Sequence, residues 1–318
     1  MLVIVKWDAL APFKPYLWFL GHRGWEMGFK GYVIRPFDPW RSRLCTCPPK
    51  YSFDPYTGCE HGCLYCYASS YIKDFYSCRP KKDLLSKVRR DLRKIPANSL
   101  ISMSNSSDPY TPMEARLKLT RRCLEEFANH RVRLLVITKG ALVSRDIDLL
   151  KRLRCAVTMT ITTLDKDLSR RLEPRAPAPS TRLNALSTLS ANGIPTGIRL
   201  DPIIPFLNDD RVEELLKEAK DVGVRHVVAS TFKPRHDSWK RMSEEFPEEM
   251  SRLERLLKMG KRIGRSWYLP RGFRFKLMRE VAEICRRLGL TFACCREGFP
   301  QLHTAKTCDG SHLIEGFD

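Results

Sequence analysis

The alternation of short apolar runs with amphipathic segments after Tyr51 limits the fold of this chain more than any other feature. We predict strands at Tyr51–Pro55, Leu100–Ser104, Leu134–Thr138, Val157–Thr162, Thr196–Leu200 and His226–Ser230. We predict helices between them at Lys82–Lys94, Leu117–Ala128, Arg145–Arg152, Thr181–Ala191 and Arg211–Val222. Repeated strand–helix units form a parallel sheet with right-handed crossovers. Six such units predict an α/β fold, a partial (β/α)6 barrel of the TIM type.

The predicted barrel covers residues 51–235 and leaves a segment on either side. Residues 1–50 are rich in aromatic residues, Gly and Pro, which favours a turn-rich N-terminal arm. Residues 236–318 form a basic C-terminal extension with a cysteine-rich tail, in which we predict a helix at Val281–Leu288 and a strand at Thr291–Cys295. Because chemistry in such barrels gathers at the carboxyl ends of the strands, the loops after the strands are the candidate site.

The loop after the first predicted strand carries three cysteines at spacings of four and three: Cys59, Cys63 and Cys66. Gly58 and Gly62 let this loop fold back on itself. Three thiolates from one short loop can hold three corners of a cubane iron–sulfur cluster and leave the fourth iron open to a ligand. The alternative is a structural zinc site that adds His61. Zinc loops usually pair two distant Cys knuckles, whereas this loop stands alone, which favours the iron–sulfur cluster.

The Cys-x3-Cys-x2-Cys spacing, with Tyr65 just before the last cysteine, resembles the signature of the radical SAM superfamily. The resemblance implies a [4Fe-4S] cluster whose open iron is chelated by S-adenosyl-L-methionine (SAM). It implies that the reduced cluster breaks a C–S bond of SAM and that the resulting 5′-deoxyadenosyl radical abstracts a substrate hydrogen. It also implies the same partial barrel and an electron donor such as a ferredoxin or flavodoxin.

Four stretches resemble a narrower group, the spore photoproduct lyase-like branch, many members of which are labelled DNA repair photolyases. These stretches are residues 56–68, 107–114, 137–139 and 173–183. The resemblance implies that SAM is contacted by Tyr65 (at the adenine), Ser107, Asp108, Lys139, Thr160 and Thr162, with Arg182 or Arg199 near the SAM carboxylate.

One departure from this branch bears on the substrate. The authentic lyase carries a hydrogen-donating cysteine shortly before the Ser-Asp pair of the second-strand loop, where this chain has Asn105 and Ser106. Tyr67 matches a tyrosine implicated in hydrogen transfer in the lyase. Tyr67, Tyr110 or a tail cysteine could therefore return or remove a hydrogen. We expect a substrate other than a thymine dimer.

Among the six cysteines outside the predicted barrel, four are candidate metal ligands: Cys45, Cys47, Cys295 and Cys308. They could form a second metal site, with a second iron–sulfur cluster, if the N-terminal arm packs against the tail. The alternatives are a zinc site, a redox-active thiol that donates hydrogen, or inert core cysteines.

A formal net charge of +20 favours a polyanionic partner, and nucleic acid is the commonest large polyanion. The alternatives are a generally basic proteome or an acidic protein partner. Residues 258–279 carry eight Lys or Arg, no acid and several aromatic residues, a mixture that can contact phosphates and stack bases. The candidate nucleic-acid contacts are Lys261, Arg262, Arg265, Arg271, Arg274 and Lys276. The same run could instead be the solvated basic face of an amphipathic helix.

We therefore expect a cytoplasmic radical SAM enzyme that acts on DNA or RNA, with no membrane partner, since no run of about eighteen apolar residues is present. One alternative keeps the enzyme class but has a peptide or protein as substrate. Another is a zinc-stabilised nucleic-acid-binding module without catalysis. The single glutamine, Gln301, is typical of a thermophile, although the cysteine and methionine counts do not follow that trend.

Overall fold

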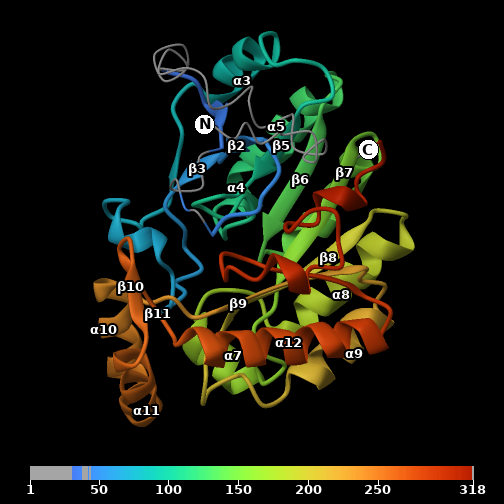
Figure 1. The fold of residues 1–318 in the computed structure, drawn as a ribbon. Helices are drawn as coiled ribbons and strands as arrows, with labels where there is room; N and C mark the ends of the chain where they lie inside the picture. The colour runs from blue at the N-terminus through green and yellow to red at the C-terminus, as the bar shows by residue number, and fades with distance from the viewer. Residues whose placement is uncertain (1–30, 38–41, 43, 317–318) are drawn as a thin grey trace, which may run out of the picture.

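A computed structural model describes residues 31–37, 42 and 44–316, so most of the predicted N-terminal arm lies outside the described residues. Within these residues, one eight-stranded sheet has the order β1-β2-β5-β6-β7-β8-β9-β12 (Figure 1). Its strands are β1 (Ile34–Pro36), β2 (Tyr51–Phe53), β5 (Leu100–Met103), β6 (Arg133–Thr138), β7 (Arg154–Thr160), β8 (Thr196–Ile203), β9 (His226–Thr231) and β12 (Thr291–Cys294). β1 runs antiparallel to β2, and every other neighbouring pair is parallel.

The six predicted strands are present, in the predicted order and in one parallel sheet, which confirms the α/β partial barrel. Two edge strands extend it. β12, from the predicted C-terminal extension, pairs with β9, and β1 pairs with β2. The central strands are apolar and buried along nearly their whole length, as parallel strands covered on both faces require.

The helices of the described residues alternate with these strands. They are α3 (Leu84–Leu92), α4 (Glu114–Leu117), α5 (Leu119–Ala128), α6 (Ile147–Leu150), α7 (Lys166–Leu172), α8 (Pro179–Ala191), α9 (Val212–Asp221), α10 (His236–Glu245), α11 (Pro247–Lys258) and α12 (Arg271–Arg287). Short 3₁₀ turns lie at Ala68–Ser70, Ala141–Asp146, Pro300–Leu302 and Ser311–Leu313. The predicted helix at 145–152 begins at the end of a 3₁₀ turn and continues only as the single turn of α6.

The long helix α12 begins ten residues before the predicted start at Val281. Its buried face is formed by Arg274, Met278, Val281 and Cys285, which recur at helical spacing. This pattern is difficult to recognise in the sequence, because one of the buried positions is an arginine and lies among other basic residues. In Figure 1, α12 lies next to α9 along one side of the sheet, and the two helices are in contact.

A small lobe stands beside the barrel, formed by α10, α11 and the hairpin of β10 (Lys261–Ile263) and β11 (Ser266–Tyr268) (Figure 1). Its core contains Met242, Phe246 and Leu253 and continues into Cys63 and Tyr65. A second two-stranded ribbon, β3 (Tyr56–Thr57) with β4 (Arg79–Pro80), flanks the cysteine loop. The lobe therefore packs directly on the loop that carries the three cysteines.

Across the described residues, none of the helices combines the length and the apolar character that crossing a membrane demands.

Candidate active site

The cysteine loop is held in place by backbone hydrogen bonds to two other parts of the chain. The N–H of Cys59 donates to the carbonyl of Phe75 at 2.7 Å, and the N–H of Leu64 donates to the carbonyl of Leu172 at 2.9 Å. A tight turn closes the end of the loop, where the N–H of Cys66 donates to the carbonyl of Cys63 at 3.2 Å. The three predicted thiols are thus brought together on one fixed backbone.

Gly58 makes the close approach to Phe75 possible. Its φ is +80°, and a Cβ at this position would lie 2.4 Å from the Phe75 carbonyl oxygen. Gly193 has nearly the same φ, +78°, but faces open space. Replacing either glycine with alanine therefore carries the same cost of a left-handed backbone conformation. Only at Gly58 does the added Cβ also clash with a neighbouring atom.

We expect Gly193→Ala to lower the free energy of unfolding by about 1–2 kcal/mol, the usual cost of a left-handed residue with a Cβ. Gly58→Ala should cost more and should also reduce the iron bound per chain, because the loop must move away from Phe75. Thermal unfolding and iron analysis of both variants test this. Equal iron content in the two variants would contradict the role given to Gly58.

The three thiols line one cavity of about 530 Å³. Its wall is built from the carboxyl ends of the sheet strands, as predicted. The lining residues at these strand ends include Asp54, Ser107, Asp108, Lys139, Thr160, Arg199, Asp201 and Lys233. Burial raises the pKa of the Cys63 thiol to about 12, and it raises the pKa of Cys59 and Cys66 as well. A bound metal is therefore needed to keep these groups as thiolates at neutral pH.

Asp108 links the loop after β5 to the end of β6. Its carboxylate accepts hydrogen bonds from the Thr138 hydroxyl at 2.5 Å and from the N–H of Lys139 at 2.7 Å. It also lies 3.4 Å from Nε2 of His61. Burial would raise the pKa of Asp108, but His61 and these hydrogen bonds outweigh it and lower the pKa to about 2. His61 therefore faces a carboxylate, an arrangement that disfavours its predicted alternative role as a zinc ligand beside the cysteines.

Tyr65 lines the cavity and is fixed from behind by a buried ion pair. Its hydroxyl donates to Glu173, and Glu173 pairs with Arg182, which is completely buried. Arg182 also donates to the carbonyl of Thr160 at 3.0 Å, and the Thr162 hydroxyl donates to Glu173 at 3.3 Å. Arg182 and Thr162 are not among the residues that line the cavity, so their predicted contacts with SAM gain no support here and stay predictions. The two residues support Tyr65.

Lys139, Thr160 and Arg199 do line the cavity, as predicted. The Lys139 ammonium lies 5.4 Å from the centre of the Tyr65 ring, a cation–π contact. Arg199 pairs with Asp201 at 2.9 Å, and Asp201 also accepts a hydrogen bond from Ser230. Lys139 and Arg199 therefore bring two cations to the cavity wall, and the second of them is paired with Asp201.

Asp54 is a site residue that sequence reasoning missed. It accepts hydrogen bonds from three successive backbone N–H groups, those of residues 105 (2.9 Å), 106 (3.3 Å) and 107 (3.3 Å). This arrangement shapes the loop after β5. Ser107 is then turned inward, and its hydroxyl oxygen is buried without a hydrogen-bond partner among the described residues. The predicted strand Tyr51–Pro55 included Asp54, whereas β2 ends at Phe53 and leaves Asp54 at its carboxyl end, where a carboxylate is a candidate site residue.

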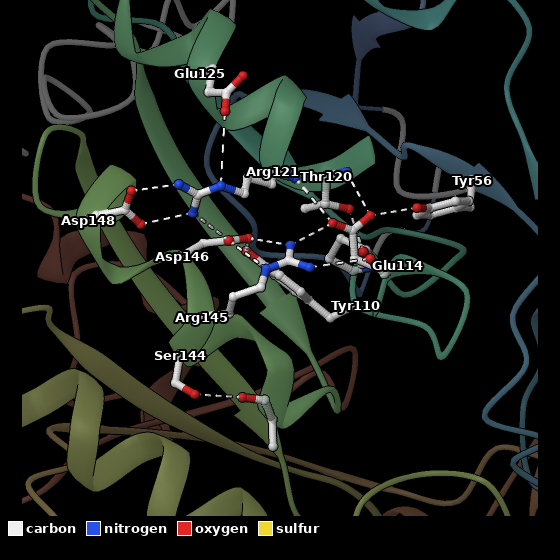
Figure 2. Close-up of polar contacts among 12 residues, drawn as sticks. Tyr56, Tyr110, Glu114, Thr120, Arg121, Glu125, Ser144, Arg145, Asp146 and Asp148 are labelled. Atoms are coloured by element: carbon white, nitrogen blue, oxygen red, sulfur yellow. Dashed lines mark hydrogen bonds and ion pairs between the residues drawn. The ribbon is translucent and has the colours of Figure 1, made fainter. Parts of the chain in front are cut away.

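The two tyrosines predicted to transfer hydrogen have different surroundings. Tyr67 lines the cavity, is 37% exposed and donates a hydrogen bond to the carbonyl of Asn105 at 3.2 Å. Tyr110 is buried outside the cavity, and its hydroxyl donates to Asp146 at 3.1 Å (Figure 2). Figure 2 shows this network, in which Glu114, Arg121, Arg145 and Asp146 connect the helices beside β6. The structure thus gives Tyr110 a place in a buried polar network away from the cavity, and its predicted catalytic role gains no support from this position.

The family model of the radical SAM superfamily matches residues 53–219, more than half of the chain. This chain belongs to the radical SAM superfamily. It is therefore an enzyme, and the alternative of a non-catalytic zinc-stabilised module is set aside. The matched residues contain the cysteine loop and the barrel strands from β5 to β8.

Several proteins are similar to this radical SAM enzyme. An uncharacterized protein of Methanocaldococcus jannaschii is 37% identical over 176 residues, which are 54% of this chain and 66%, just under two thirds, of that protein. The radical SAM Nalpha-GlyT isomerase of Pseudomonas phage M6 is 25% identical over 260 residues, which are 77% of this chain and 53% of that enzyme. A structure of spore photoproduct lyase with dinucleoside spore photoproduct has a TM-score of 0.59 at 16% identity, covering 77% of this chain and 76% of that one. This likeness confirms the predicted fold.

The residues of the radical SAM enzyme fit the cofactors of its family. Three thiols on one loop, all facing one cavity, are the ligands that an iron–sulfur cluster needs when one iron is left open. The buried, unpartnered hydroxyl of Ser107 and the Lys139 ammonium offer polar contacts for a ligand beside the thiols. When bound, the cluster supplies the electron for cleavage of SAM, and the protein holds Tyr65, Lys139 and Asp108 in fixed positions around it.

The four cysteines of the predicted second site line the same cavity of the radical SAM enzyme: Cys45, Cys47, Cys295 and Cys308. The structure thus brings the N-terminal arm and the tail together at the active site, as the prediction required. Among the described residues, no three His, Cys, Asp or Glu side chains are grouped as ligands of a single ion.

The predicted basic surface is divided between two elements. Lys261, Arg262 and Arg265 are exposed on the β10–β11 hairpin, while Arg271 and Lys276 are exposed on α12. Arg274 is buried and pairs with Glu297 at 2.7 Å, and Glu297 also pairs with Lys233 at 2.6 Å. Arg274 therefore does not belong to the exposed basic surface, and its predicted contact with nucleic acid gains no support from this position.

Proposed function

We propose that this radical SAM enzyme binds a [4Fe-4S] cluster through Cys59, Cys63 and Cys66, cleaves SAM reductively and modifies or repairs a nucleic acid. The electron donor would be a ferredoxin or flavodoxin. The main support for the substrate is a basic, aromatic second cavity next to the active site. It has a volume of about 890 Å³ and is lined by residues that include Arg235, Trp239, Lys258, Arg262, Arg265 and Trp267.

Arg235 connects the two cavities, because it lines both of them. Its guanidinium carbon lies 5.7 Å from the ring centre of Tyr67 and 5.6 Å from that of Tyr71, and it donates a hydrogen bond to Ser70 at 2.6 Å. A chain that crosses the second cavity would therefore meet Arg235 before it reaches the cysteines. The exposed ring of Trp267, flanked by Arg262 and Arg265, suits a stacked base and its phosphates.

The relatives agree with this proposal. The name of the phage enzyme describes it as an isomerase of Nalpha-GlyT, and spore photoproduct lyase has been solved with a dinucleoside spore photoproduct. Direct reversal of a thymine dimer is not what we propose, since the second-strand loop has Asn105 and Ser106 where the lyase has its cysteine.

We expect Arg262→Ala/Arg265→Ala to weaken binding of single-stranded DNA and RNA. The slope of the logarithm of the binding constant against the logarithm of the salt concentration should become shallower, because about two fewer counterions are released on binding. Trp267→Ala should cost about 1–3 kcal/mol of binding free energy through lost stacking. Fluorescence anisotropy with labelled oligonucleotides at several salt concentrations measures both effects.

The matched control is Lys217→Ala/Lys220→Ala, which removes two exposed charges from α9. It lowers the net charge equally but leaves the second cavity intact. If both double variants weakened binding to the same degree, the affinity would come from net charge alone and the proposed binding surface would be wrong. The oligonucleotide with the higher affinity distinguishes DNA from RNA.

A further inference from the structure

The segment before β2 is joined to the C-terminal tail by a buried ion pair. The ammonium of Lys50 lies 2.5 Å from the carboxylate of Asp309, and both side chains are almost completely buried. Asp309 is held in turn by Ser311, whose hydroxyl donates to it at 2.6 Å. This contact brings Cys47 and Cys308 together, with their sulfur atoms 3.4 Å apart. Two thiols from opposite ends of the described chain therefore meet at one point of the cavity wall.

The two other cysteines are close to this pair. Cys45 lies two residues before Cys47, and Cys295 directly follows β12, where its N–H donates to the carbonyl of Ala229 at 2.8 Å. Arg296 has a φ of +56°, which turns the chain away after Cys295. Cys295 lines the same cavity as Cys45, Cys47 and Cys308. The four thiols thus come from three segments and share one wall.

The surroundings of these four thiols differ from those of ordinary core cysteines. Other cysteines belong to the main hydrophobic core: Cys78, Cys123, Cys155, Cys285 and Cys294. The four thiols that meet between the arm and the tail line a polar cavity instead, beside cationic side chains. Lys50, Arg199 and Lys233 lie along the same wall, offset in part by Asp201 and Asp309. Cations at this position offset the negative charge that several thiolates bring into a buried site.

We propose that Cys45, Cys47, Cys295 and Cys308 ligate a second iron–sulfur cluster, separate from that of Cys59, Cys63 and Cys66. A set of four sulfur ligands selects zinc or an iron–sulfur cluster. A cluster occupies more space than a single ion and can be held by thiols that are further apart, which suits ligands from three segments. The proposal does not depend on the substrate, because it concerns only which side chains bind iron.

The test is iron and acid-labile sulfide per chain after anaerobic reconstitution, with Mössbauer spectroscopy to identify the cluster type. We expect about eight irons in the full chain and about four in Cys59→Ala/Cys63→Ala/Cys66→Ala. Cys295→Ala/Cys308→Ala should also retain about four. The matched control is Cys155→Ala/Cys285→Ala, which removes two core thiols and should keep about eight.

Three results would overturn the proposal: about four irons in the full chain with none in the triple variant, zinc in place of iron at the four cysteines, or a Cys47–Cys308 disulfide in the anaerobically purified protein. Because Cys308 is buried, its variant could fail to fold, which circular dichroism would reveal. The triple variant keeps the proposal testable in that case, since it leaves all four cysteines in place. Cys45→Ser, at a half-buried position, gives a second measurement: replacing one of the four ligands should change the Mössbauer signal of the second cluster, and an unchanged signal would also contradict the proposal.

Discussion

Replacing Cys63 with alanine is expected to abolish formation of 5′-deoxyadenosine from SAM and to remove the cluster of the first loop. Cys63 is the middle ligand of the three and is buried against Tyr65 and the core of the small lobe. Two thiols from one loop leave a cubane with two unprotected irons, so the cluster should not survive purification. The measurements are deoxyadenosine by chromatography under reductant and the visible absorbance of the cluster.

Cys285→Ala serves as the control, because this thiol lies on the buried face of α12, in the main core, and does not line the cavity. It should keep its absorbance and its turnover of SAM. Turnover by Cys63→Ala at the rate of the unaltered enzyme would refute the assignment of the first cluster.

Arg182→Ala should lower the free energy of unfolding by about 3–5 kcal/mol, the range for a buried ion pair that loses one partner. Arg182 is fully buried, and its removal leaves the Glu173 carboxylate without its cation. Burial would raise the pKa of Glu173, but Arg182 and Lys139 outweigh it and lower the pKa. Since a lowered carboxyl pKa stabilises the folded state above the unfolded pKa, this contribution is lost as the pH falls through the folded value.

Chemical denaturation at neutral pH measures the effect, with Arg170→Ala as its control. Arg170 pairs with Asp167 at 3.1 Å, but both side chains are at least 70% exposed. An exposed pair contributes at most about 1 kcal/mol, so this variant should stay close to the unaltered enzyme. Similar losses in the two variants would mean that the Glu173–Arg182 pair does not stabilise the fold beyond a surface contact. The Arg182 variant should also show weaker binding of SAM, since Tyr65 loses its support.

The strand order and the position of the site could be predicted from the sequence because both depend on local patterns. Apolar runs and helical periodicity are set by neighbouring residues, and a parallel sheet gathers the ends of its strands at one edge. Cys59, Ser107, Lys139 and Arg199 were found in this way and line the cavity. The cysteine motif also indicates an iron–sulfur cluster by itself, because its three ligands lie close together in the sequence.

The partners of individual side chains could not be predicted, because they come from distant parts of the chain. Arg182, in α8, and Tyr110, in the loop after β5, each pair with a buried carboxylate and do not line the cavity. Arg274 lies in a basic run and is nevertheless paired with Glu297 inside the protein. Because a charged residue occupies a buried position in the first half of α12, the apolar periodicity that predicts a helix was not recognised there.

The contact between Lys50 and Asp309 joins residues that are 259 positions apart. A ribosome releases the chain from its N-terminus, so Cys45 and Cys47 leave the exit tunnel long before the tail that faces them. During that interval the barrel lacks β12 as well, and the cavity is open to solvent on the side that the tail later covers. The loop of Cys59, Cys63 and Cys66 needs only Phe75 and the Leu172 segment for its backbone contacts and can form earlier in translation. Newly made chains therefore pass through a stage in which the cavity thiols already synthesised are exposed to cellular oxidants, and any metal bound across the N-terminal and C-terminal walls must be inserted after translation has ended.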